Sequence, residues 1–113
     1  MATVELPVRQ RGEVCTPLRR MRPERVAEMT EVVKALADPT RLEMVAILRD
    51  AKTAVCICDL TATFGLSQPT MSHHMARLRD AGLVESDKDG IWCYYRLRRD
   101  LSPAVKRIVD SIA

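Results

Sequence analysis

Two helical segments near the middle of the chain are separated by only three residues, Gly65, Leu66 and Ser67. Glycine adopts the left-handed backbone conformation in which helices commonly end, and serine is a preferred N-cap. We therefore predict a short helix at residues 59–64 that stops at Gly65, and a longer helix at residues 68–81 that Ser67 caps. Two helices joined by so short a turn form a helix-turn-helix.

The longer helix has two chemically different faces. Met71, Met75 and Leu78 recur at helical spacing and predict a buried stripe. The opposite face and the first turn are rich in side chains that bind base edges or phosphates, although an ordinary solvated helix could have the same composition. The candidate DNA-binding residues of this helix are Gln68, Pro69, Thr70, Ser72, His73 and Arg77.

A β-hairpin is predicted directly after this helix. Strand-like runs at residues 83–86 and 91–97 flank residues 87–90, whose sequence DKDG suits a tight turn. The expected wing is basic, with Lys88 at its tip and, behind it, Arg96, Arg98 and Arg99. A basic hairpin after a helix-turn-helix favours DNA binding over a merely solvated helix, so Lys88 joins the candidate DNA-binding residues.

Periodicity and capping residues predict three further helices. One begins at Pro23, a second spans residues 39–50 behind the N-cap Asp38, and a last one follows the N-cap Ser102. The last helix has an apolar stripe, which needs a partner to cover it and consists of Val105, Ile108, Val109 and Ile112.

At 113 residues, 47% of them hydrophobic, the chain is long enough for one domain and too short for two. We divide it into a flexible N-terminal tail at residues 1–22, which carries Cys15, and a DNA-binding and dimerisation domain at residues 23–113. The fold class that we predict is mainly α with a small β-hairpin (α+β), a dimeric winged helix-turn-helix.

Composition excludes several classes of protein. No stretch has the apolar length of a membrane span, and the N-terminus lacks the apolar run of a signal peptide, so we expect a cytoplasmic protein without a membrane partner. The net charge of +3 is only a weak indication of nucleic-acid binding. In a reducing compartment, four cysteines favour metal binding, redox sensing or core packing over disulfides.

Three of the cysteines are candidate metal ligands. Cys56 and Cys58 would point about 200° apart on a regular helix, so a shared ion requires the less regular backbone of a helix start. Two thiolates suit As(III), Sb(III), Cd(II), Pb(II) or cuprous copper, and Cys15 could supply a third from its own subunit or from the partner. Cys93 alternates in phase with Ile91, Tyr95 and Leu97 on the expected inner face of the wing strand, which predicts core packing.

The adjacent histidines are weaker metal candidates. His73 and His74 point about 100° apart on a helix and do not readily share one ion, and no third ligand is predicted near them. We assign His73 to DNA and expect His74, at the edge of the buried stripe, to be a half-buried structural residue.

Taken together, these segments make the chain resemble the ArsR/SmtB family of metal-sensing repressors, most closely its arsenical-resistance branch. The segments that carry the resemblance are LADPTRLEMVAIL (36–48), CICDL (56–60), GLSQPTMSHHMARLRDAGLV (65–84) and GIWCYYRL (90–97). The resemblance implies a bacterial homodimer joined through the first and last helices. It also implies that Gln68, Pro69, Ser72 and His73 meet the major groove of an operator with inverted repeats, and that an inducer at the C-x-C loosens DNA binding.

Two departures from the family pattern bear on the inducer. Some arsenical repressors have a third cysteine shortly after the pair, where this chain has Thr61, which makes Cys15 the substitute. No histidine follows His74, which argues against the family's zinc site on the last helix. The expected inducer is therefore As(III) or Sb(III), with Cd(II) or Pb(II) as alternatives.

Three other functions use the same cysteines. A thiol oxidoreductase more usually has C-x-x-C in a strand-helix-strand unit, and a soft-metal chaperone needs no DNA-reading helix, so we predict a repressor and no enzyme. A repressor that responds to oxidation of the Cys56 and Cys58 pair is the nearest alternative, and reversal by reductant would identify it.

Overall fold

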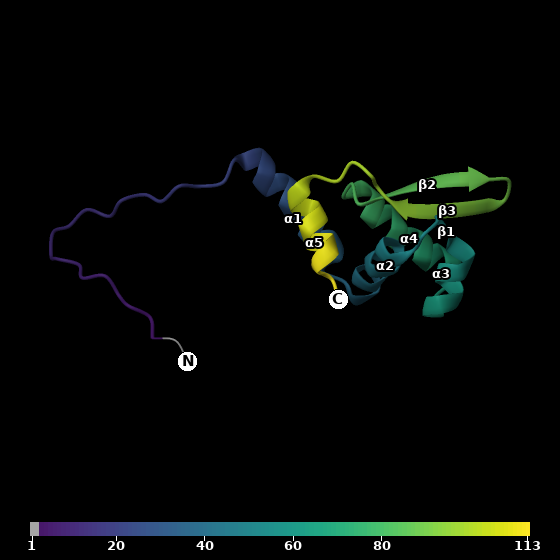
Figure 1. Cartoon of the computed structure of the whole chain (residues 1–113), viewed down its shortest axis with the longest axis horizontal. Coiled ribbons are helices and arrows are strands. Elements are labelled where there is room, and N and C mark those ends of the chain that lie inside the picture. Colours follow the sequence, from purple (N-terminus) through teal and green to yellow (C-terminus); the bar gives the residue numbers. More distant parts are fainter. Residues whose placement is uncertain (1–2) are drawn as a thin grey trace.

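In the computed structural model, which describes residues 3–113, five helices and one small sheet follow an extended tail (Figure 1). The helices are α1 (Pro23–Leu36), α2 (Pro39–Asp50), α3 (Ile57–Phe64), α4 (Gln68–Asp80) and α5 (Pro103–Ser111). The strands are β1 (Val55–Cys56), β2 (Val84–Asp89) and β3 (Trp92–Leu97). This is the predicted winged helix-turn-helix, mainly α with a β-hairpin.

The N-caps that local sequence predicts are present. The Asp38 carboxylate accepts from the Arg41 N–H at 3.0 Å, and the hydroxyls of Ser67 and Ser102 each accept from an N–H three residues later. Gly65 has a φ of 65° and ends α3 in the left-handed conformation. The three-residue turn between α3 and α4 is therefore as predicted.

The boundaries of α3 differ from the prediction. The helix begins at Ile57 rather than Asp59, because residues 55 and 56 form a short strand, β1, that the sequence did not reveal. In β1, Val55 pairs with Tyr95 and Cys56 with Tyr94, so the sheet order is β1-β3-β2. The consequence is that Cys58 lies inside the first turn of α3 and Cys56 lies just outside it.

The hairpin turn also differs from the prediction. Strand β2 continues through Asp89, which pairs with Trp92, so the loop is Gly90–Ile91 rather than residues 87–90. Gly90 has a φ of 62°, and no non-glycine residue among the described residues has a positive φ, as in a type II′ turn. Lys88 is therefore a strand residue paired with Cys93, and Ile91 is exposed rather than on the inner face.

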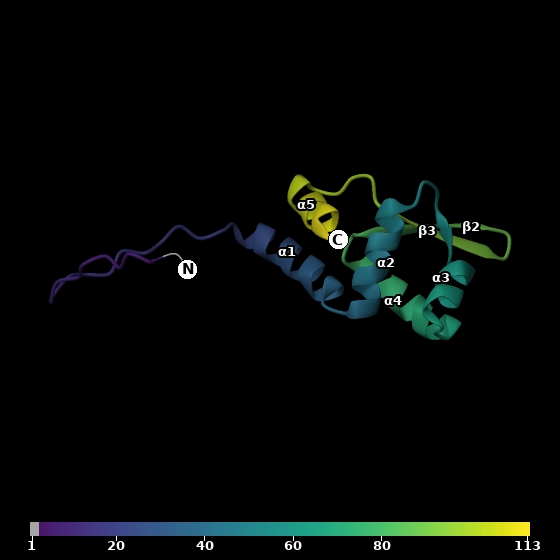
Figure 2. The ribbon, with the colours of Figure 1, turned by 60° about the horizontal axis from the view of Figure 1, so that its bottom comes forward.

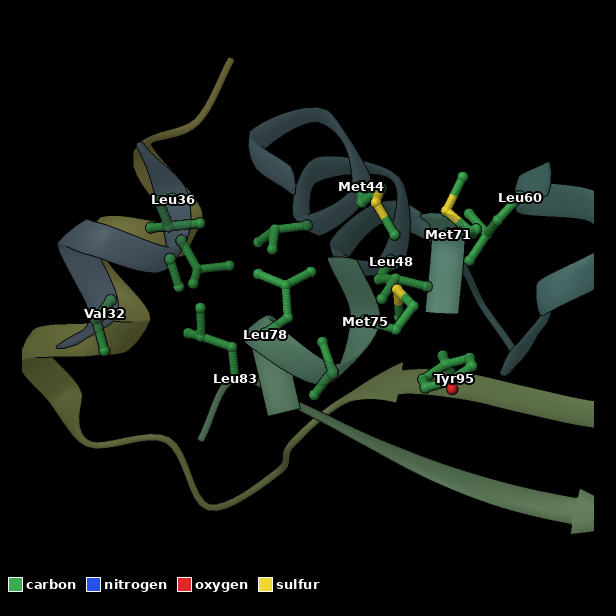
Figure 3. Packing of buried hydrophobic residues seen from close by; sticks show 14 of the residues in the cluster. Val32, Leu36, Met44, Leu48, Leu60, Met71, Met75, Leu78, Leu83 and Tyr95 are labelled. Carbon is green, nitrogen blue, oxygen red and sulfur yellow. The ribbon is translucent and has the colours of Figure 1, made fainter. Parts of the chain in front are cut away.

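One hydrophobic core joins the helices to the hairpin. The side chains of Leu78, Leu83 and Val84 are completely buried, and those of Val105 and Val109 bring α5 into the same cluster. Figure 3 shows the fully buried side chains of three methionines, Met44 of α2 and two of α4, gathered near Leu60 of α3. The two from α4 are Met71 and Met75.

The end of α2 is bound to the end of α5. The Arg49 guanidinium donates to the Val109 carbonyl at 2.9 Å and also to the carbonyl of Ile112. Because the last carbonyls of a helix have no partner within the helix, these bonds both cap α5 and fix it against α2.

An apolar surface remains uncovered on α1, α2 and α5. Val33 is 54% exposed and Leu42 39% exposed, and both line a hollow of about 430 Å³ together with Ile108 and Ile112. The surface continues along α1 through Val26, which is 44% exposed. The predicted apolar stripe of α5 is thus only half covered within one chain.

The predicted tail at residues 1–22 is irregular where the structure describes it, mostly extended with one turn at residues 11–12. Its first two residues lie outside the described residues, and residues 3–22 are exposed without helix or strand. Figures 1 and 2 both show the tail leaving α1 on the side away from α3 and the hairpin. Within residues 3–113, no helix combines the length and apolarity needed to cross a membrane.

Candidate nucleic-acid interface and thiolate site

Helix α4 is buried on one side and exposed on the other. Met71, Met75 and Leu78 have no accessible surface, as their spacing predicts. All six candidate DNA-binding residues of this helix are exposed: Gln68, Pro69, Thr70, Ser72, His73 and Arg77. The structure therefore places them on one accessible surface that includes the N-terminus of α4.

The N-terminus of α4 is capped, which limits what it offers to a phosphate. The Thr70 N–H donates to the Ser67 hydroxyl at 3.3 Å, and the hydroxyls of these two residues lie 2.9 Å apart. Pro69 has no N–H. This end therefore offers an anion side chains such as Gln68 and the partial positive charge of the helix end, rather than a full set of free N–H groups.

His74 is half-buried, with 15% of its side chain exposed, and its imidazole contacts other side chains of the protein. Its Nδ1 lies 3.3 Å from an Arg41 guanidinium nitrogen and 3.9 Å from the Asp38 carboxylate. The contacts fix α4 to the start of α2, which is the structural role expected for this histidine.

Arg41 is a residue whose importance the sequence did not reveal. Its Nε donates to the Ala35 carbonyl at 2.7 Å, so one guanidinium contacts both the end of α1 and His74 of α4. Helical periodicity cannot separate such an arginine from a solvated one. The backbone N–H of Arg41 lowers the pKa of the Asp38 carboxyl below its usual value, and the nearby charges of Arg41 and His74 lower it further.

The wing is not basic. Arg96 binds the Glu85 carboxylate at 3.1 Å and also binds Asp87, while Arg98 binds Asp100 at 2.8 Å. Residues 84–97 contain three carboxylates and two cationic side chains, so their net charge is −1. Lys88 is exposed and has no ion-pair partner among the described residues, which makes it the wing's available cation.

Cys56 and Cys58 lie on either side of a change in backbone conformation. Cys56 is extended, with a φ of −67° and a ψ of 136°, and occupies the N-cap position, whereas Cys58 is helical. The 200° separation of a regular helix therefore does not apply to this pair. Cys56 is 9% exposed and lies outside the main hydrophobic cluster, and Cys58 is exposed to solvent.

The other two cysteines lie elsewhere. Cys15 is exposed on the tail, and the described residues contain no group of three or more side chains arranged to hold a metal ion. One chain therefore does not by itself bring Cys15 to the pair. Cys93 is half-buried and packs against the core beside Tyr95, as predicted. Burial raises the pKa of the Tyr95 hydroxyl, and a hydrogen bond with Cys93 raises it further.

Comparison with known proteins gives one consistent result. Residues 38–86, from the cap of α2 to the first half of β2, match the family model described as bacterial regulatory protein, arsR family. The arsenical resistance operon repressor of Escherichia coli K12 is 39% identical over 81 residues, which are 72% of this chain and 68% of that protein.

Solved structures share the fold. HlyU from Vibrio cholerae N16961 is 29% identical and superposes with a TM-score of 0.68 over 79% of this chain and 91% of HlyU. A Mycobacterium bovis protein, described as a homodimeric winged helix-turn-helix DNA-binding domain, is 25% identical. Its TM-score is 0.63, over 82% of this chain and 84% of that one.

Proposed function

The chain belongs to the ArsR family of DNA-binding transcriptional repressors, and from that premise we propose that it is a metalloid-responsive repressor. It binds double-stranded operator DNA with inverted repeats as a homodimer. A thiophilic ion, As(III) or Sb(III), releases the DNA by binding cysteine thiolates, and Cd(II) and Pb(II) are the alternative inducers.

The exposed surface of α4 is the observation that carries DNA binding. A helix with one face fully buried and the other composed of Gln68, Ser72, His73 and Arg77 can insert into a major groove without losing its core contacts. In this proposal Pro69 also meets the major groove, and Thr70 lies against the DNA backbone at the start of the helix. Lys88 binds a phosphate from the wing.

The uncovered apolar surface of α1, α2 and α5 supports the homodimer. Val33 and Leu42 are large hydrophobic residues left exposed beside the half-covered stripe of α5. A second copy that packs on this surface removes it from water and sets two α4 helices about one DNA turn apart. Such a dimer reads an inverted repeat.

The thiolates of Cys56 and Cys58 provide the proposed inducer site. Soft thiolate ligands select soft ions such as As(III), and the E. coli relative is named as an arsenical resistance repressor. The extended backbone at Cys56 frees its thiolate from the helical spacing that would otherwise separate it from Cys58. Cys15 is the proposed third ligand.

The direction of the tail favours Cys15 from the partner subunit. The tail leaves α1 away from its own α3 (Figure 2), and α1 belongs to the proposed dimer surface. Cys15 lies eight positions before Pro23, a span of about 28 Å when extended. The tail of one subunit thus starts at the interface and has the length to continue over its partner.

Release of DNA follows from the position of the thiolates. Cys56 and Cys58 flank the start of α3, and only residues 65–67 join α3 to α4. An ion that draws the two thiolates together shifts α3, and α4 with it, so that the two reading helices no longer match their half-sites. A coupling free energy of about 3 kcal/mol lowers DNA affinity roughly 150-fold.

An arsenite titration tests this function. A duplex selected by the protein from a randomised pool is labelled, and its release is followed by fluorescence anisotropy. Arsenite is expected to release the duplex from the wild type and from Cys93→Ser, the matched control, but not from Cys56→Ser or Cys58→Ser. Release from both of the latter variants would refute the thiolate site, and release reversed by reductant alone would identify a redox switch instead.

A further inference from the structure

The net positive charge of the chain lies in its tail. Residues 1–22 contain five arginines and two glutamates, which gives +3, the same net charge as the whole chain. Residues 23–113 are therefore neutral overall. The folded domain contains the DNA-reading helix but no net charge to attract a polyanion.

Ion pairing reinforces this separation. Among the described residues, the side-chain ion pairs all lie between residues 38 and 110 and neutralise cations such as Arg49, Arg96 and Arg98. None involves the tail, where the arginines are exposed outside any helix or strand. These are Arg9, Arg11, Arg19, Arg20 and Arg22.

Duplex binding draws much of its affinity from neutralised phosphates. Each lysine or arginine that contacts a phosphate releases counterions, and exposed arginine also enters narrow minor grooves. Within residues 84–97 the net charge is −1 and Lys88 is the cation without an ion pair. Helix α4 adds the exposed arginines Arg77 and Arg79, and Arg99 follows β3, so the folded domain offers four unpaired cations in these segments. The five tail arginines are the largest concentration of unpaired positive charge on the described chain.

The tail is long enough to reach DNA held by α4. Arg9 is fourteen residues from Pro23, a span of about 46 Å when extended. The whole chain, tail included, measures 70 Å along the axis on which the tail leaves the domain, so the folded domain alone is shorter than this. A tail of about 46 Å that turns back along the domain, or that continues over the partner subunit, can follow a duplex beside α4.

We propose that residues 9–22 form a basic arm that binds the phosphates and minor groove of DNA next to the half-site read by α4. This inference rests on the proposed DNA binding. Arg9 and Arg11 precede Cys15 and the other three arginines follow it, so an ion that fixes Cys15 at the thiolate pair withdraws the arm from the duplex. DNA and inducer then compete for one segment of chain.

The salt dependence of binding by the full chain tests the arm. The affinity for the selected duplex is measured between 50 and 300 mM KCl for the wild type and for a variant with all five arginines replaced by glutamine. Each arginine on a phosphate contributes about 0.9 to the slope of log K against log salt, so the slope is expected to fall by about 2 to 4.5 for each subunit, or about 4 to 9 for the dimer. Because the tail lies outside the core, the variant should unfold at the wild-type temperature.

Two double variants that remove the same number of charges distinguish contacts made by the arm from a general effect of net charge. Arg9→Gln with Arg11→Gln should lower the slope by up to about 1.8 for each subunit, or about 3.6 for the dimer. Lys52→Gln with Arg107→Gln, which removes two exposed cations from each folded domain, should lower it by less. If the wild type and the five-arginine variant have equal slopes, the basic arm is wrong but the proposed DNA binding by α4 is not affected. A wild type that binds no duplex would overturn the proposed function.

A lipid surface is the competing polyanion. If phosphatidylglycerol vesicles retain the wild type but not the five-arginine variant, while both give the same DNA slope, the arm belongs to a membrane surface and the proposal is wrong. If the variant loses DNA affinity and neither protein is retained by vesicles, the proposal is supported.

Discussion

The Arg41 guanidinium lies 3.3 Å from Nδ1 of His74 and so joins the start of α2 to the middle of α4. Through Nε the same side chain binds the Ala35 carbonyl at the end of α1. One residue therefore links the helix with the uncovered apolar surface to the helix with the exposed polar face. A movement of α4 relative to α1 must rearrange these bonds.

Replacing Arg41 should disturb both stability and DNA binding. Arg41→Gln loses the bonds to Ala35 and His74, and we expect the free energy of unfolding in urea to fall by about 1–3 kcal/mol. Since α4 is then less firmly oriented, its affinity for the selected duplex should also fall. Arg107→Gln, an exposed replacement on α5, is the control. Equal DNA affinity in the two variants would show that α4 is oriented by its core contacts alone.

The Asp38 cap gives a pH dependence of known sign. Its pKa is lowered in the folded protein, so the carboxylate stabilises the fold above the unfolded pKa of about 3.9 and this stabilisation disappears as pH falls through the folded value. At pH 7 Asp38→Ala should therefore cost about 1 kcal/mol. The difference from wild type, measured by urea unfolding, should shrink below pH 4. A difference that grows on acidification would contradict the assignment.

The wing should reveal which of its cations is available to DNA. Lys88 has no ion-pair partner among the described residues, so Lys88→Gln should lower the slope of log K against log salt by about 0.9 for each subunit, or about 1.8 for the dimer. Arg96 is held by Glu85 and Asp87, and Arg96→Gln should change the slope much less. The reverse order would mean that Arg96 leaves its carboxylates when DNA binds.

A charge on the apolar surface should separate the subunits. Val33→Glu places a carboxylate where the second copy is proposed to pack, and an unpaired buried charge is strongly unfavourable. Sedimentation should show a monomer with weaker operator binding. Ile91→Glu, at the exposed turn of the hairpin, is the matched control and should remain dimeric. A dimeric Val33→Glu protein would place the interface elsewhere.

Removing the third proposed thiolate should weaken the response to inducer without abolishing it. Cys15→Ser keeps the Cys56 and Cys58 pair, so arsenite should still release DNA, at about tenfold higher concentration, which corresponds to about 1.4 kcal/mol of lost binding free energy. Mixed dimers in which one subunit has Cys15→Ser and the other Cys58→Ser show whether ligation crosses the interface. If it does, one of their two sites loses two ligands and the other remains intact.

Local signals predicted most of the fold. The caps at Asp38, Ser67 and Ser102 and the positive φ at Gly65 depend on residues within one turn of each other, and all four are present. Strand β1 could not be predicted in this way, because two residues carry no periodicity and their pairing partners lie 38 to 40 residues away.

The hairpin shows how pairing overrides a local turn signal. The sequence DKDG favours a turn at residues 87–90, but burial of Tyr95 and Leu83 fixes the register, and Gly90 then becomes the first loop residue. The same register sets Arg96 opposite Glu85 and diagonal to Asp87. Because the sequence did not predict this register, it also did not predict that Glu85 and Asp87 neutralise Arg96.

The candidate site was predictable where it depends on a single helix. The exposed polar face of α4 follows from its period, whereas the contact between Arg41 and His74 joins residues 33 positions apart. The position of Cys15 relative to Cys58 depends on a second subunit, and one chain does not determine it.

The buried methionines bear on how α4 can respond to an event at α3. Thioether side chains are unbranched and have several rotatable bonds, so they change rotamer with little strain and refill space that a moving neighbour vacates. Met71 and Met75 line the inner side of α4 and lie in the same buried cluster as Met44 of α2. The core under α4 can therefore repack when the helix tilts slightly, without leaving a cavity. Replacing Met71 or Met75 with Leu or Ile should favour either the DNA-bound or the inducer-bound position of α4 over the other.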